Sequence, residues 1–494
     1  MATVYSGCTT VDPQPDFQRA TDLINEHTGV DDVYDPTTED LIDGKVDDLL
    51  ADGLTVDEAV RVALLNNRSF QALFQTIGAS RADVVQSGLL SNPSVSFLTQ
   101  FPEGGGRAKL EVGFAQELVD LWQIPVRKRI AQEQLQQTVL EVTQRAVALA
   151  ADAKSACYRL LVARQAEGTG KKGVELFRQS LDLADRQFKA GESSQVDVDL
   201  ARSELTQAEL ALLSLQRDRR LAEAALARVL GLNRMATSWE LVGPLPDPSA
   251  LPDDETLLRM AMTQRIDGRL ARSQVDAAEQ ELRLEVLHVF PSLEVGATLE
   301  RTDRRALPGR KILADTARAS VRNGRLTAPD IQTRAERNLE RRQIIDSLLG
   351  PTITFALPIW DQNQAQIAKA RFKVHQKRKE FEDLLDAVAY EVQRASTIAR
   401  NAAAQVRYYE REVLPLAQKN VDAARRLYQA GEQGILVLIE SQELFIEQRR
   451  FYEDAVRDRA VAIAELEAAV GGRLDWPMDE PVGPPSTMLE PTSK

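Results

Sequence analysis

The sequence contains an internal duplication, which limits the folds open to this chain more than any other feature. Pro93-Ser94-Val95 in the first half recurs as Pro291-Ser292-Leu293, displaced by 198 positions. Further along, residues 187–192 (QFKAGE) recur as 427–432 (LYQAGE), displaced by 240 positions. Self-similarity of this kind indicates two copies of one structural unit. The change of offset from 198 to 240 predicts roughly 42 additional residues in the second copy.

The duplication also defines the expected domains. Residues 1–53 are rich in Asp, Thr and Pro without a helical period, so an extended N-terminal tether is predicted there. The second copy carries the insertion, at about 301–343. The remaining parts are a first copy at 54–232, a linker at 233–253, a second copy at 254–472 and a Pro-rich tail at 473–494.

Each copy is predicted to contain a helix, two strands, a long helix, a tight turn and a long returning helix. The opening helices are expected at 54–90 and 254–289, and Thr55 with Glu58 suits a capping box at the first of them. Long helices are expected at 125–164 and 362–413. A helix of some 50 residues spans about 75 Å, which no ordinary globular core requires.

Glycine and proline set the predicted helix ends. Three glycines within 167–173 predict a break in the first long helix, and Pro415 predicts an interruption of the second. Tight turns are expected at Gly191 and Gly431. The returning helices should end at glycines that fit the left-handed cap conformation, namely Gly231 and Gly471.

Four segments alternate apolar and polar residues with the period of a β-strand: 93–101, 110–118, 292–300 and 352–359. Each has about the length of a tilted membrane strand. A small soluble sheet with one face on a helix is the alternative. Acidic residues on the face opposite the apolar one favour a water-filled lumen, and they are Glu111, Glu117, Glu294 and Glu300. Four strands cannot close on themselves, and lipid does not tolerate an open sheet edge, so membrane strands would require an oligomer.

Composition excludes several classes of protein. The net charge of −13 argues against nucleic-acid binding. Three histidines and two cysteines, far apart in sequence, form neither a zinc pattern nor a disulfide framework. No nucleophile with its base, phosphate-binding glycine loop or metal-ligand spacing is present, so neither an enzyme nor a cofactor is predicted. Cys157 is expected to be a buried apolar residue.

Ser6-Gly7-Cys8 resembles the end of a bacterial lipoprotein signal. Tyr5 departs from the usual leucine, and seven residues are too few for a whole signal peptide. We therefore expect Cys8 to be the lipidation site, with the rest of the signal encoded upstream. A chance cysteine near the chain terminus is the alternative.

The whole arrangement resembles the TolC-like outer membrane efflux protein family, over about 54–472. The matching motifs are Ser91-Asn92-Pro93 before a strand, the hairpin from Ala190-Gly191 through Asp197 to Ala201-Arg202, and FALPIWD at 355–361 between strand and helix. The resemblance implies a mainly α fold in which three chains of four strands close a twelve-stranded outer membrane β-barrel above a periplasmic α-barrel. It also implies passage of small molecules from an inner membrane transporter through a periplasmic adaptor protein to the exterior.

The same resemblance assigns roles to particular residues. It places Gly191, Glu192, Gly431 and Glu432 at the periplasmic entrance, where the adaptor would bind. Asp197 and its neighbour Asp199 would form rings of charge in a homotrimer and attract cations. The second copy has Leu436 near the position of Asp197, and a helix-capping role for Asp197 remains open.

The insertion 301–343 holds twelve basic and five acidic residues, a net charge of +7. It is expected at the outer surface, where it would contact outer membrane lipid, namely lipopolysaccharide phosphates; a solvated loop is the alternative. Two other functions stay open. One is an exit duct of type I protein secretion, and the other is a soluble periplasmic coiled-coil scaffold.

Overall fold

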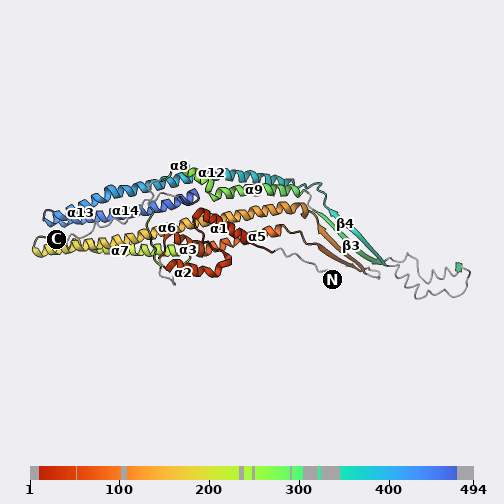
Figure 1. Cartoon of the computed structure of the whole chain (residues 1–494), viewed down its shortest axis with the longest axis horizontal. Helices are drawn as coiled ribbons and strands as arrows, with labels where there is room; N and C mark the ends of the chain where they lie inside the picture. Colours follow the sequence, from red (N-terminus) through yellow and green to blue (C-terminus); the bar gives the residue numbers. More distant parts are fainter. Residues whose placement is uncertain are drawn as a thin grey trace. The chain divides into compact units, whose positions relative to one another are not determined.

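The computed structural model describes residues 10–51, 53–101, 108–232, 239–246, 251–289, 292–303, 321–322, 324 and 345–474. Over these ranges the protein is mainly helical, with one four-stranded antiparallel sheet (Figure 1). Two compact units divide the chain. The helical unit comprises Met1–Ala82, Glu133–Asp276 and Gln376–Lys494, and the sheet unit comprises Asp83–Gln132 and Ala277–His375.

The N-terminal segment of the helical unit is folded, so the prediction of an extended tether is wrong for its described part. It forms α1 (Gln14–Thr28), a 3-10 turn η1 (Pro36–Leu41) and α2 (Ile42–Ala51). Phe17 of α1 stacks on Phe74 at 5.4 Å between ring centroids, and Tyr34 meets the same ring edge-on at 5.8 Å. These aromatic contacts stabilise helices that the polar composition of the segment does not predict.

The opening helix of each copy is divided rather than continuous. The first consists of α3 (Val56–Asn66), α4 (Arg68–Phe74) and α5 (Thr76–Ser87), and the second of α8 (Asp254–Gln264) and α9 (Ile266–Leu287). The capping box at Thr55 is confirmed: its backbone N–H donates to Glu58 Oε2 at 2.8 Å, and Glu58 N–H donates back to Thr55 Oγ1 at 3.3 Å.

Both opening helices break at equivalent positions, because Asn67 and Arg265 are 198 residues apart and both have extended backbones. Asn67 Nδ2 donates to the carbonyl of Val229 at 2.9 Å. Arg265 donates from one terminal guanidinium nitrogen to the carbonyl of Ala469 at 3.0 Å, and Val229 and Ala469 are 240 residues apart. Different side chains therefore make the same tertiary contact in each copy.

The first long helix is α6 (Asp120–Ala190), and it continues for 71 residues. The predicted break at 167–173 is wrong. A β-carbon at Gly170 would lie 2.6 Å from Leu215 Cδ1, and one at Gly173 would lie 3.4 Å from Ile446 Cδ1. The glycines therefore allow neighbouring helices to approach closely, and this packing outweighs their low helix propensity.

The second long helix begins as α12 (Gln364–Tyr408) and passes through a π-helical turn, η2 (Tyr409–Val413), into α13 (Leu414–Gln429). Pro415 lies at the start of α13. A π turn rearranges the hydrogen bonds that proline cannot make, so the chain stays helical where an interruption is predicted.

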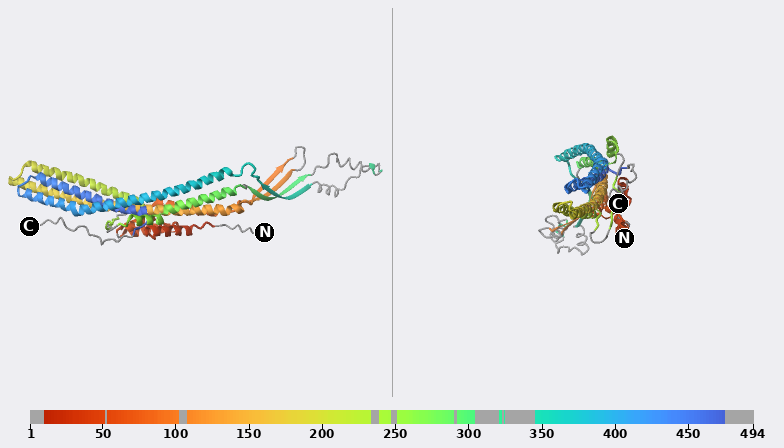
Figure 2. Two further views of the ribbon diagram at one scale, coloured as in Figure 1. Left: turned by 90° about the horizontal axis from the view of Figure 1, so that it is seen from above. Right: turned by 90° about the vertical axis from the view of Figure 1, so that its left-hand side faces the viewer.

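The returning helices are α7 (Gln195–Val229) and α14 (Ile435–Val470). The α6–α7 hairpin lies beside the α13–α14 hairpin (Figures 1 and 2). The predicted left-handed ends are confirmed, since φ is 70° at Gly231 and 95° at Gly471. No described helix has the length and apolar character needed to cross a membrane.

The sheet unit contains β1 (Ser94–Gln100), β2 (Lys109–Glu117), β3 (Leu293–Asp303) and β4 (Ile345–Phe355), paired in that order. Strand β4 begins seven residues before the predicted segment 352–359, because it pairs with the whole length of β3, and it ends four residues earlier, at the residue paired with the first residue of β3. Cys8, most of the insertion 301–343, and residues 475–494 lie outside the described residues.

Candidate functional site

One face of the sheet is apolar and exposed. Cross-strand pairing aligns Phe97 with Val112, Val112 with Leu299, and Leu299 with Leu349, so one row of apolar side chains crosses all four strands. The exposed fractions are 74% for Phe97, 77% for Leu349 and 64% for Ile353. A folded protein rarely leaves so many large apolar side chains exposed to water. We therefore expect another surface to cover this face.

The opposite face is mainly polar, although Leu98 and Leu348 lie on it, and it carries the predicted acidic residues. Glu111 pairs directly with Glu300 and Glu117 with Glu294, so the four carboxylates share one face. Lys109 Nζ lies 3.0 Å from Glu300 and 3.3 Å from Glu111, and it neutralises part of one pair. Both predicted strand faces are therefore confirmed.

The sheet has two open edges in the described part of the chain. Strand β1 pairs only with β2, and β4 pairs only with β3. The outer backbone N–H and C=O groups of β1 and β4 are free to pair with strands of other chains.

The two helical hairpins end in turns of the same type. Glu192 N–H donates to Gln187 O at 2.8 Å, and Glu432 N–H donates to Leu427 O at 3.0 Å. These bonds form Schellman motifs, which require the left-handed φ of 80° at Gly191 and 70° at Gly431. All four predicted tip residues, Gly191, Glu192, Gly431 and Glu432, are exposed.

Below these turns the two hairpins are held together. Gln187 Nε2 donates to Tyr428 O at 3.2 Å, and Ser180 Oγ donates to the buried Gln442 Oε1 at 2.9 Å. Burial, with a smaller effect of Asp197, raises the pKa of Tyr428 to about 12. The surrounding buried cluster is Ala184, Val198, Ala201, Ala424, Tyr428, Ile435, Leu438 and Ile439.

Asp197 caps helix α7, which confirms the capping hypothesis. Its carboxylate accepts the backbone N–H of Ser194 at 2.9 Å, and its own N–H donates to Ser194 Oγ at 3.2 Å. Asp199 is exposed and accepts a hydrogen bond from Gln195 Nε2 at 3.0 Å. In the second copy Gly434 occupies the N-cap position that Ser194 has in the first copy, and Leu436 is 52% exposed.

A carboxyl pair between α7 and α14 was not predicted. Glu204 hydrogen-bonds Glu443, and this contact, together with burial and charge repulsion, raises the pKa of Glu443 to about 7. The residue 240 positions after Glu204 is Leu444, so the duplication gives no signal for the pair.

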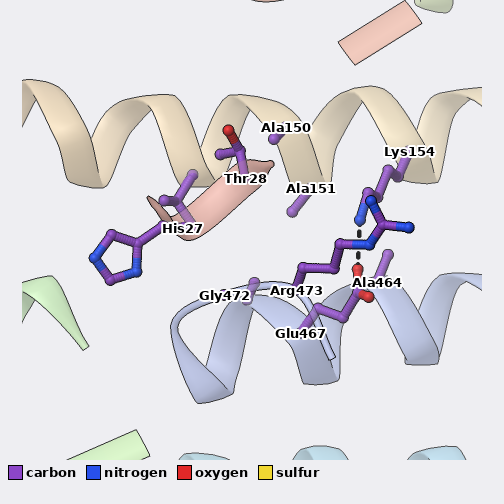
Figure 3. Close-up of a pocket in the computed structure, with 11 residues that line it drawn as sticks. His27, Thr28, Ala150, Ala151, Lys154, Ala464, Glu467, Gly472 and Arg473 are labelled. Carbon is purple, nitrogen blue, oxygen red and sulfur yellow. Dashed lines mark hydrogen bonds and ion pairs between the residues drawn. The ribbon is translucent and has the colours of Figure 1, made fainter. Parts of the chain in front are cut away.

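A second unpredicted feature is a small pocket where α1 meets α6 and the end of α14 (Figure 3). Lys154 Nζ lies 2.6 Å from Glu467, and His27 Nδ1 is 2.8 Å from the carbonyl of Gly471. The N-terminal helix is thus tied to the end of the second copy. Residues 444 positions apart meet here, which no local pattern predicts.

The described residues contain no group of metal-ligating side chains close enough to hold an ion. Cys157 is buried as predicted, and burial raises the pKa of its thiol to about 12. A thiol of this kind is a poor nucleophile at neutral pH.

Comparison with known families decides the identity of the chain. A model of the outer membrane efflux protein family matches residues 59–232 and 257–472. The chain belongs to the outer membrane efflux protein family. The two matched segments fall within the two copies seen in the sequence, and the predicted resemblance is confirmed.

Solved structures agree with this efflux-family fold. The outer-membrane channel OprN is 18% identical, with 90% of this chain and 94% of OprN covered and a TM-score of 0.64. CusC, whose structures concern transmembrane channel formation, is 17% identical, with 85% and 92% covered and a TM-score of 0.65. VceC of Vibrio cholerae is 16% identical, with 84% and 96% covered and a TM-score of 0.63.

No curated protein matches the sequence. The efflux family and these structural neighbours comprise outer membrane channels rather than enzymes. The mainly α fold with its small antiparallel sheet is therefore the fold of this channel family.

Proposed function

We propose that this protein is the outer membrane channel of a tripartite efflux system. It would pass small molecules from an inner membrane transporter and a periplasmic adaptor to the exterior. The observation that carries the proposal is the sheet, whose apolar face is exposed across all four strands while its opposite face holds carboxylates. Lipid on one side and water on the other would satisfy both faces.

Three copies would complete the membrane part. The open edges of β1 and β4 support pairing between chains, because unpaired backbone groups cost several kcal/mol each in lipid. Three times four strands gives a closed barrel of twelve, as the family resemblance implies. The chain would therefore function as a homotrimer.

The hairpins would form the periplasmic entrance. Their exposed tips at Gly191 and Gly431 have the same geometry, which supports a shared docking role toward the adaptor. Asp199 is exposed and Asp197 half-buried, so threefold symmetry would create carboxylate rings that attract cations. Acylation of Cys8 would add a lipid anchor, and the basic insertion 301–343 would contact lipopolysaccharide phosphates.

A soluble periplasmic scaffold explains the helices but leaves the exposed apolar face of the sheet without a partner. Fractionation and unheated gel electrophoresis test the choice. A heat-sensitive trimer in the outer membrane fraction supports the channel, and deletion of the gene should sensitise the cell to small toxic compounds. A soluble monomer or dimer in the periplasm would overturn the proposal.

A further inference from the structure

Two basic segments begin the long helices of this acidic protein. Residues 121–132 contain Arg127, Lys128 and Arg129 and no acidic residue. Residues 362–375 contain Lys369, Arg371 and Lys373, again with no acidic residue. Arg129 and Lys369 are 240 positions apart, so the basic charge recurs at the same place in each copy.

Most of this charge is not neutralised. Arg127 pairs with Asp120, and Lys373 lies 2.5 Å from Glu281. The other four basic side chains are exposed and form no ion pair with any residue that the structure describes. We call them the basic collar, and they are Lys128, Arg129, Lys369 and Arg371.

The basic collar follows directly on the apolar strand face within the sheet unit. After β4 the chain exposes Leu357, Ile359 and Trp360, with Trp360 86% exposed, and α12 then begins at Gln364. After β2, Leu121 is 62% exposed at the start of α6. Membrane proteins have this order of residues where the chain leaves the hydrocarbon core of the bilayer and crosses the headgroup region: apolar residues first, then tryptophan, then lysine and arginine.

We propose that the basic collar binds the phosphates of anionic phospholipids in the periplasmic leaflet of the membrane that holds the sheet. The inference rests on the proposed function, because it requires the sheet to lie in that membrane. Charge complementarity supports it, since lysine and arginine near an anionic surface are attracted over about one Debye length. The adjacent apolar residues favour a lipid headgroup over free phosphate, which would not contact them.

Lipid selectivity tests the proposal. Purified protein is reconstituted in phosphatidylcholine vesicles with trace spin-labelled lipid, and electron paramagnetic resonance measures the fraction immobilised on the protein. Phosphatidylglycerol should associate about threefold more strongly than phosphatidylcholine, and 0.5 M NaCl should abolish the preference. The Arg129→Gln/Lys369→Gln double variant should lose the preference, whereas Lys172→Gln/Lys419→Gln, which removes two exposed charges elsewhere, should keep it.

The outcomes separate the two proposals. Unheated electrophoresis first establishes whether each variant is a membrane trimer, and a soluble protein would refute the channel itself. A trimer without lipid preference, or an unchanged preference in the Arg129→Gln/Lys369→Gln variant, overturns only the proposal that the basic collar binds anionic phospholipids. Loss of the preference on adding 50 mM inorganic phosphate at constant ionic strength would also overturn it, because the site would then bind free anions.

Trp360 gives an independent measurement of depth. Phospholipids brominated near the headgroup should quench part of the tryptophan fluorescence, and Trp360→Phe should remove much of that part. Trp239→Phe, in the helical unit, should leave it unchanged. Equal quenching in both variants would show that Trp360 does not lie at the membrane boundary.

Discussion

Thr169 of α6 donates a hydrogen bond to the buried carboxylate of Glu453 in α14. Glu453 is only 2% exposed, and burial raises the pKa of its carboxyl group. Thr169 precedes Gly170, where a β-carbon would lie 2.6 Å from Leu215 Cδ1, so the absence of a side chain at Gly170 lets α6 approach its neighbour. The contact therefore joins the glycine run of one copy to the returning helix of the other.

Thr169→Val should lower the free energy of unfolding of the helical unit by about 1–3 kcal/mol, because a buried carboxyl group loses a donor. Chemical denaturation in detergent, followed by circular dichroism, measures the change. The control is Thr397→Val, which removes an exposed hydroxyl bonded at 2.8 Å to the carbonyl of Gln393 in its own helix. An equal loss in both variants would contradict the role of the Thr169 contact.

Gly231→Ala should destabilise the protein by about 2 kcal/mol or more. The residue has a left-handed φ of 70°, and a β-carbon there would lie 2.4 Å from the carbonyl oxygen of Asn66. Gly168→Ala is the matched change, because nothing lies within 4 Å of its β-carbon and its backbone is helical. It should instead stabilise the protein by about 0.5–1 kcal/mol. Thermal unfolding of both variants should show shifts of opposite sign.

Ile353→Arg should prevent insertion of the sheet into the membrane, since arginine on the lipid face costs about 2–4 kcal/mol per chain at the bilayer midplane. Thr354→Arg places the same side chain on the polar face, opposite Glu294, and should be tolerated. The yield of heat-sensitive trimer in outer membrane fractions compares the two. Equal yields would show that the two faces are not in different solvents.

Glu443→Gln should stabilise the protein at pH 8 and have little effect at pH 5. The folded-state pKa of Glu443 is about 7, against 4.5 for an ordinary glutamate, so its stabilising contribution is full below pH 4.5 and is lost as the pH rises through 7. The pair is partly exposed, so solvent screening limits the expected rise in melting temperature to about 1–2 °C.

Thermal melts of wild type, Glu443→Gln and Glu447→Gln at both pH values give the measurement. Glu447 is exposed on the next turn of the same helix, and its substitution should give no comparable pH-dependent difference. A Glu443→Gln variant that remains less stable than wild type at pH 8 would contradict the carboxyl repulsion.

Several features that depend on neighbouring residues were predicted from the sequence. Strand faces follow from alternation at period two, so the shared apolar face of Phe97, Val112 and Leu299 was predicted before any strand was paired, whereas Leu349 lies outside the predicted segment 352–359. The turns at Gly191 and Gly431 follow from a residue type that accepts positive φ at low energy. The capping box of Thr55 and Glu58 spans three residues and needs no tertiary partner.

Predictions from the sequence were wrong where a contact between residues distant in sequence outweighed a local conformational preference. Glycine has a low helix propensity, which predicted a break at 167–173, but packing of Leu215 and Ile446 against these positions keeps α6 helical. The polar N-terminal segment predicted a tether, but Phe17 packs on Phe74 and stabilises α1. Neither partner is near in sequence.

The sequence by itself therefore determined the duplication, the two faces of the strands, the hairpin turns and the family. The tertiary structure alone decided the continuity of α6, the packing of the N-terminal helices, the carboxyl pair of Glu204 and Glu443, and the contact between Thr169 and Glu453. The physical reason is the distance in sequence over which each effect acts. Side-chain alternation and backbone propensity depend only on residues a few positions apart. Burial and the pairing of charges depend on which helices meet.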